Sequence, residues 1–152
     1  MKKLFVILAA LLAFGVASSA QTRAIGLRGN LAGVEISCQS VLGHGRNFIE
    51  SDLGVAFAQG SFGIDVATAF DFVLAHPGNF NFYAGPGAMV SMVFSEGNSA
   101  FVPGLLAQIG GEYNFANVPL NISVDWRPTY IFYAGYSGIA WMEFGLGLRY
   151  RF

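Results

Sequence analysis

The chain has 152 residues, of which 54% are hydrophobic and only 11% are charged, and its formal net charge is −1. About a quarter of the residues are charged in an ordinary soluble domain, so this composition favours a protein with an apolar surface. Without Lys2 and Lys3, six basic residues remain against nine acidic ones, a balance of −3. Because clustered lysines and arginines are missing, we expect no nucleic-acid partner.

Residues 1–20 are predicted to be a cleavable signal peptide. A short basic start is followed by an apolar core over 4–16 and by small residues over 17–20. The core is shorter than the stretch of about 20 apolar residues that crosses a bilayer as a helix. We expect cleavage after Ala20 and no lipid anchor, because no cysteine follows directly. The mature chain, 21–152, is short for two domains and is predicted to form one.

Turn signals divide the mature chain into eight predicted strands. Clusters of glycine, proline and asparagine separate runs in which apolar and polar residues alternate. These runs are long for a soluble domain, where about 5–6 residues are typical, and suit a tilted membrane strand of about 9–11 residues. We expect strands over about 22–31, 33–42, 47–58, 63–74, 80–93, 104–115, 120–133 and 139–152, and the longest connection at 95–103.

Two prolines fall inside predicted strands. Pro86 interrupts the fifth strand and Pro128 the seventh. A proline cannot donate a ladder hydrogen bond, so we expect both to lie at a bulge or near the rim of the sheet.

The last strand shows which face of the sheet is buried. Its even-numbered positions from 142 to 152 are methionine, leucine, phenylalanine or tyrosine, and its odd-numbered positions from 143 to 151 are glutamate, glycine or arginine. Strand side chains alternate between two faces, so one face is apolar and the other is small or charged. Charges on the inside predict a barrel in lipid, whereas a soluble barrel of lipocalin type would place the apolar face inside.

Charged residues of the inward parity are predicted to plug the lumen. Interiors of eight-stranded barrels are filled by side chains, and a buried charge must be paired because its desolvation costs several kcal/mol. We expect Arg28 to lie near Glu35 and Arg127 near Glu143, with at least one arginine in contact with a carboxylate. The alternative is that these charged residues form a path for protons or cations through the lumen. The predicted network comprises Arg28, Glu35, Glu50, Asp52, Asp65, Asp71, Glu112, Asp125, Arg127, Glu143, Arg149 and Arg151.

An even number of strands places both termini on the same side of a barrel. In outer-membrane barrels this side is the periplasm, where the turns are short. The turns at 43–46, 76–79 and 116–119 would then be periplasmic, and the connection at 95–103 would face outward.

Together, these segments resemble a known family. The runs AIGLRGN, VEISCQS, NFIESDLG, FNFYAGPGA, QIGGEYNF, PLNISVDWRP and GLGLRYRF look like the strands of small OmpA/OmpX-type outer-membrane barrels of the porin-like superfamily. The resemblance implies a closed eight-stranded antiparallel up-and-down barrel with a filled interior. It implies no particular activity. The terminal Phe152 resembles the C-terminal signal that the barrel-insertion machinery reads.

We therefore expect a monomeric all-β transmembrane barrel in the bacterial outer membrane, with lipids and the insertion machinery as partners. The expected role is structural or interactive, without catalysis, metal or cofactor. The alternatives are a narrow channel, a secreted lipocalin-like ligand binder and a lipid-modifying barrel enzyme. The enzyme is disfavoured because His44 and His76 both fall in predicted periplasmic turns, away from the outer leaflet.

Overall fold

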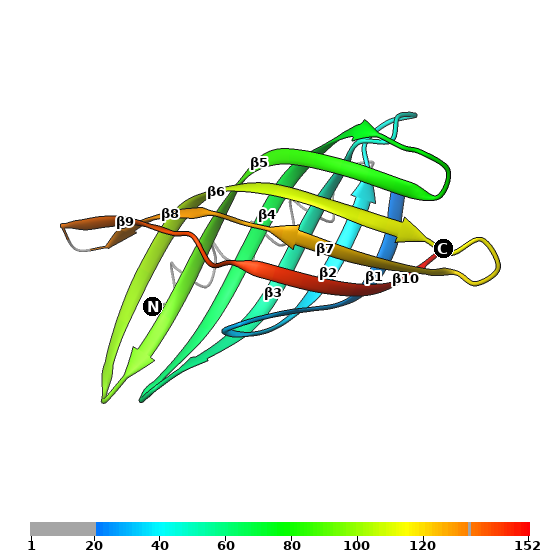
Figure 1. Cartoon of the computed structure of the whole chain (residues 1–152). Coiled ribbons are helices and arrows are strands. Elements are labelled where there is room, and N and C mark those ends of the chain that lie inside the picture. The colour runs from blue at the N-terminus through cyan, green and yellow to red at the C-terminus, as the bar shows by residue number, and fades with distance from the viewer. Residues whose placement is uncertain (1–20, 134) are drawn as a thin grey trace.

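The computed structural model describes residues 21–133 and 135–152, and the signal peptide predicted for 1–20 lies outside them. The described residues form ten strands and no helix (Figure 1). No helix in this part of the chain is long and apolar enough to span a membrane. The strands are β1 (Gln21–Asn30), β2 (Gly33–Val41), β3 (Phe48–Ala58), β4 (Ser61–Ala75), β5 (Phe80–Ser95), β6 (Asn98–Asn114), β7 (Leu120–Trp126), β8 (Thr129–Tyr133), β9 (Tyr136–Ala140) and β10 (Phe144–Arg151).

The strands close into one antiparallel barrel. Each pairs with its sequence neighbour from β1 to β6, and β10 joins β1 to β7, which pairs with β6. β7 and β8 are two parts of one barrel strand because both pair with β6, and β9 and β10 make up the next one. The eight-stranded antiparallel barrel predicted from the sequence is therefore confirmed.

The two ends of the barrel differ in their connections. The termini end carries Gln21, Arg151 and the turns after β2, β4 and β6. The hairpin end carries the turns after β1, β3, β5 and β8. Figure 1 shows the β8–β9 hairpin reaching away from the other strands there, and β9 pairs with β8 alone.

The long connection predicted at 95–103 is wrong. β5 and β6 continue toward each other until Ser95 pairs with Asn98, so only two residues turn the chain. Glu96 and Gly97 have φ values of 44° and 82°. Two consecutive positive φ values match the right-handed twist of a hairpin, and this tight turn holds residues 98–103 in the ladder.

The two prolines behave differently. Pro128 lies in the break between β7 and β8, as predicted, and its carbonyl accepts a hydrogen bond from Ala107 N at 3.1 Å. The prediction for Pro86 is wrong, because it lies well inside β5 and pairs with Ala107 of β6. No ladder pair joins Pro86 to β4, although its neighbour Gly87 pairs with Ala69. The missing donor is tolerated there without a bulge at Pro86 itself.

The burial of alternate residues is inverted relative to a soluble protein. In β10, Leu146 and Leu148 are 57% and 54% exposed, whereas Arg149 is 1% exposed. The same contrast holds around the barrel. Among the described residues, buried polar and charged side chains outnumber buried apolar ones, and large apolar side chains of nearly every strand lie on the outside. The predicted face assignment is therefore correct, and the core of this molecule is its polar lumen.

Candidate functional site

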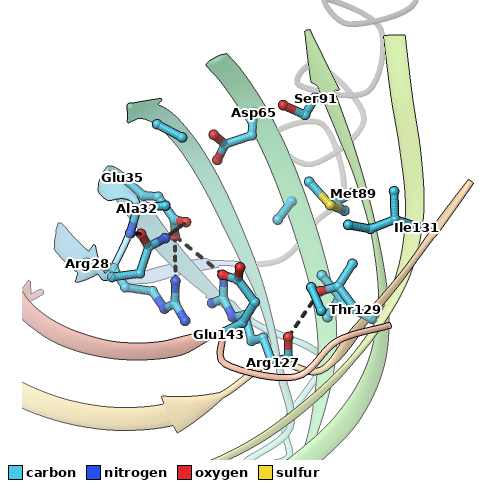
Figure 2. A pocket seen from close by; sticks show the side chains of 15 residues that line it. Arg28, Ala32, Glu35, Asp65, Met89, Ser91, Arg127, Thr129, Ile131 and Glu143 are labelled. Atoms are coloured by element: carbon cyan, nitrogen blue, oxygen red, sulfur yellow. Dashed lines mark hydrogen bonds and ion pairs between the residues drawn. The ribbon is translucent and has the colours of Figure 1, made fainter. Parts of the chain in front are cut away.

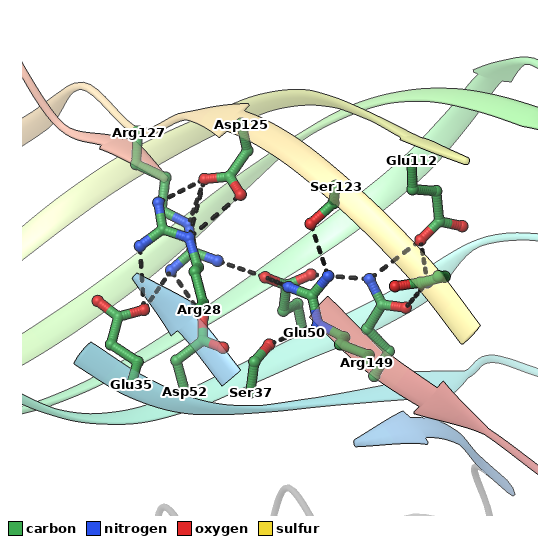
Figure 3. A network of polar contacts seen from close by, with 12 residues as sticks. Arg28, Glu35, Ser37, Glu50, Asp52, Glu112, Ser123, Asp125, Arg127 and Arg149 are labelled. Carbon is green, nitrogen blue, oxygen red and sulfur yellow. Dashed lines mark hydrogen bonds and ion pairs between the residues drawn. The ribbon is translucent and has the colours of Figure 1, made fainter. Parts of the chain in front are cut away.

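Two arginines meet several carboxylates in the half of the lumen nearer the hairpin end (Figure 3). Arg28 of β1 donates from Nε to both carboxylate oxygens of Asp125, at 3.0 and 3.1 Å, and from Nη1 to Glu35 at 3.0 Å. Its Nη2 also contacts Asp125. Arg127, which directly follows β7, places Nη1 2.6 Å from Asp52 and 3.5 Å from Glu35. Both guanidinium groups thus share carboxylates, and Glu35 joins them.

Glu50 of β3 connects this group to the centre of the lumen. Its Oε1 accepts hydrogen bonds from Arg127 Nη2 at 2.5 Å and from Arg149 Nη2 at 2.7 Å. Arg149 also donates to the hydroxyls of Ser37 at 2.8 Å and Ser123 at 2.7 Å. The side chains come from four separate strands, so the interaction crosses the barrel rather than following one hairpin.

Amide side chains extend the network toward the termini end. Gln39 donates to Glu50 at 2.9 Å and lies 3.3 Å from Glu112. Glu112 accepts from Asn81 at 2.7 Å and from Asn121 at 2.9 Å, and it forms an ion pair with Arg23. The lumen network is therefore continuous from Glu35 to Arg23.

Glycines make room for this network. A Cβ at Gly145 would collide with the Arg28 guanidinium, and one at Gly147 would collide with the Ser123 hydroxyl. A Cβ at Gly110 would lie 2.6 Å from the Tyr83 hydroxyl. Small inward residues on β10 and β6 thus leave space for side chains of the adjacent strands to lie across them.

The lumen network nearly balances its charges. Four arginines, at 23, 28, 127 and 149, meet five carboxylates, at 35, 50, 52, 112 and 125. All but Arg23 are almost fully buried. Removing ions from water costs several kcal/mol each, and this cost is offset only when good geometry and further hydrogen bonds satisfy the remaining atoms. The shared carboxylates, serines and amides provide those bonds.

The structure places four of the sequence-predicted residues outside the lumen network. Asp65 and Glu143 are half-buried and line the hairpin-end cavity, without an ion pair among the described residues. Asp71 is fully buried, and neither of its carboxylate oxygens has a hydrogen-bond partner there. Arg151 donates to the carbonyl of Phe115 at 2.7 Å.

The prediction that at least one arginine contacts an inward carboxylate is confirmed, because Arg28 forms an ion pair with Glu35. Arg127 and Glu143 form no ion pair with each other among the described residues. The two residues are neighbours, since Arg127 N donates to Glu143 O at 2.8 Å. The Arg127 side chain instead extends across the lumen to the buried carboxylates of Glu50 and Asp52. Glu143 is half-buried and lines the hairpin-end cavity.

The uncharged members of the lumen network were missed because the sequence analysis considered charged residues only. Their inward parity was the available signal, since each alternates with an outward apolar residue. They are Ser37, Gln39, Asn81, Asn121 and Ser123, all fully or almost fully buried. Arg23, which contacts Glu112 and lies over the ring of Phe48 at 4.7 Å, was also missed, because a register shift between Thr22 and Ala24 interrupts the alternation of β1 there.

Two cavities lie on opposite sides of the lumen network. The hairpin-end cavity has about 150 Å³ and is lined by Asp65, Glu143 and apolar side chains such as Met89 and Leu106 (Figure 2). The termini-end cavity has about 370 Å³ and is lined by arginines and asparagines. They share no lining residue, and neither is lined by Glu50, Arg149, Gln39 or Asn121. The middle of the network therefore separates them.

The positions of the two histidines are relevant to the question of catalysis. Both histidines of the chain, His44 and His76, are exposed in turns of the termini end. A serine–histidine–acid arrangement at the hairpin end would need a histidine there. Among the described residues, no group of three or more His, Cys, Asp and Glu side chains is arranged to hold a metal ion.

Comparison of the chain with family models, curated proteins and solved structures found no significant match. The conclusion that the structure supports by itself is a small, closed, eight-stranded antiparallel β-barrel with a charged interior.

Proposed function

We propose that this chain is an outer-membrane barrel of the OmpA/OmpX type, monomeric, with a lumen closed by paired charges and a structural or interaction role in the bacterial envelope. The observation that carries this proposal is the inverted burial. Soluble monomers rarely expose contiguous apolar patches beyond a few hundred Å². Here leucine, isoleucine, valine and phenylalanine side chains are exposed around the barrel, and arginine and glutamate lie inside. Hydrocarbon is the environment in which this arrangement is favourable.

Outward aromatic residues support the same placement. Phe80, Tyr113 and Phe115 are in ring contact near the termini end, with centroids 4.8 and 5.0 Å apart. Trp126 and Trp141 stack with centroids 6.3 Å apart, nearer the hairpin end. Aromatic groups at two levels match the girdles that membrane proteins place at the two interfaces.

The soluble lipocalin-like alternative is disfavoured by the lumen itself. An apolar ligand needs an apolar cavity, but the centre of this barrel is filled by arginine and carboxylate side chains. The test is refolding of residues 21–152 with and without a neutral detergent. We expect a folded, monodisperse protein only in detergent. A monomer that is folded and soluble without detergent would contradict the proposal.

The proposed orientation of the barrel in the membrane can be tested by surface labelling. We expect an epitope inserted at Gly97–Asn98, in the hairpin end, to be labelled on intact cells, and one at Gly78–Asn79, in the termini end, to be labelled only after the outer membrane is permeabilised. Labelling at Gly78 with protection at Gly97 would reverse the orientation.

The channel alternative predicts conductance. The lumen network separates the two cavities, so we expect the purified barrel to give no stable current steps in a planar lipid bilayer. Reproducible single-channel steps that change with Glu50→Gln would favour the channel instead.

A further inference from the structure

The termini end of the lumen opens into a cavity of about 370 Å³ that the lumen network does not fill. Its polar lining comes from the first strand, the last strand and three turns or strand ends. The polar side chains are Arg23, Arg46, Arg151, Asn79, Asn81 and Asn114. Arginine and asparagine side chains all carry N–H donors, so the lining is rich in donors.

The charge of this lining is positive. Among the residues that the structure describes, no aspartate or glutamate side chain lines the cavity. Even with an α-carboxylate at Phe152 counted as one negative charge, the three arginines leave a balance of about +2. Glu112 pairs with Arg23 from the side of the lumen network and lowers this balance to about +1, but it forms no ion pair with Arg46. The opposite cavity is lined by two arginines and three carboxylates, so its formal balance is about −1 and the two ends differ in sign.

Donors in the termini-end cavity remain available. The Nε of Arg151 is buried and has no acceptor among the described residues, while its Nη2 is held 2.7 Å from the carbonyl of Phe115. Arg23 is held in place by Glu112 and by the ring of Phe48. Arg46 forms no ion pair within the described residues. Two guanidinium groups are therefore positioned by the barrel, and a third lies in the turn above them.

We propose that the termini-end cavity binds a phosphate group. The planar fork of a guanidinium donates two parallel hydrogen bonds to a phosphate, and such charge-assisted bonds are about twice as strong as neutral ones. A phosphate monoester also offers three acceptor oxygens to these guanidinium groups, one more than a carboxylate does. The phosphate belongs to a soluble monoester or to a phospholipid head group. This inference does not depend on the membrane orientation, although the proposed orientation places the cavity on the periplasmic side.

The test is calorimetric titration of inorganic phosphate into the folded chain in an uncharged maltoside detergent. We expect saturable binding at one site. Arg46→Gln should weaken the binding by about tenfold or more, because it removes a charge-assisted interaction from an exposed turn. Asn79→Asp should weaken it similarly, because it introduces a negative charge into the lining.

Asn98→Asp is the matched control, since it makes the same substitution in the turn region of the opposite end. It should leave phosphate binding unchanged, and circular dichroism should show that every variant is folded. Absence of saturable binding, or an equal loss in Asn98→Asp and Asn79→Asp, would overturn the proposal. Competition by methyl phosphate identifies a soluble monoester as the source, and competition only by phosphatidylglycerol in the micelle identifies a head group.

Discussion

The inward and outward faces of the same strands impose different demands on their residues. On the inward face, Arg28 is 1% exposed and its guanidinium meets Asp125 and Glu35 in defined geometry. On the outward face, its neighbour Leu27 is 57% exposed. Of these two adjacent residues, Arg28 therefore belongs to a network of specific contacts, and Leu27 belongs to the apolar outer surface. The lumen therefore requires particular partners, whereas the outside requires only that a side chain be apolar.

The largest effect should come from breaking the lumen network at one partner. Arg28→Met leaves the buried Asp125 carboxylate without its main donor. Removing one member of a buried ion pair typically costs about 3–5 kcal/mol, because the other charge stays buried. We expect Arg28→Met and Asp125→Leu each to lower the free energy of unfolding by that amount in urea titrations in detergent, and the double variant to lose much less than their sum. Additive losses would show that the two side chains do not act as a pair.

The next effect concerns the outward face. Leu146→Arg should cost about 2–4 kcal/mol if this position lies near the middle of a bilayer, because a charge is moved into hydrocarbon. Leu146→Val is the control, since it keeps the position apolar. Unfolding in lipid vesicles measures both. An arginine at 146 that costs nothing in lipid would show that this face meets water.

Substitutions at two glycines on adjacent strands allow a direct comparison of the inward and outward faces. Gly145 of β10 pairs with Asn30 of β1, and Gly29 of β1 pairs with Leu146. A Cβ at Gly145 would collide with the Arg28 guanidinium, whereas one at Gly29 would meet nothing within 4 Å. We expect Gly145→Ala to destabilise the barrel by about 1–3 kcal/mol through overpacking. Gly29→Ala should be neutral or slightly stabilising, and equal losses in thermal unfolding would refute the close packing above Gly145.

The smallest effect should come from a buried carboxylate outside the lumen network. Both oxygens of Asp71 lack a hydrogen-bond partner among the described residues. A buried charge without a partner is unfavourable, so Asp71→Asn should leave stability unchanged or raise it by up to about 1 kcal/mol. Asp125→Asn is the matched control and should be destabilising. Thermal unfolding of the two variants measures the difference, and a large loss in Asp71→Asn would reveal a partner for this carboxylate.

Strand existence and face assignment followed from local sequence. Alternation along β3, β6, β7 and β10 identified the inward residues because side chains on a strand change face at every step. The connection at 95–103 was predicted poorly because Glu96 adopts a positive φ, which is uncommon for a residue with a side chain. The position of Pro86 was predicted poorly because its neighbour strands tolerate the missing donor.

The partners of the charged side chains in the lumen could be predicted from the sequence only in part. Arg28–Glu35 was predictable because β1 and β2 form a hairpin, and Arg28 pairs with Glu35 in the ladder. The backbone N–H of Arg127 donates to the carbonyl of Glu143, yet the Arg127 side chain reaches Glu50 and Asp52 on β3. No local pattern indicates that choice, because it depends on the width of the closed barrel and on how far a guanidinium extends across it.

The sequence by itself determined the class of fold, the number of barrel strands and the face that most charged residues of the strands occupy, since these depend on local alternation and turn residues. Only the tertiary structure decided which charges are shared, which carboxylates stay outside the lumen network and where the two cavities lie. Closure brings together β1, β3, β7 and β10, which are far apart in the chain, and pairing in a crowded lumen depends on those distances rather than on sequence separation.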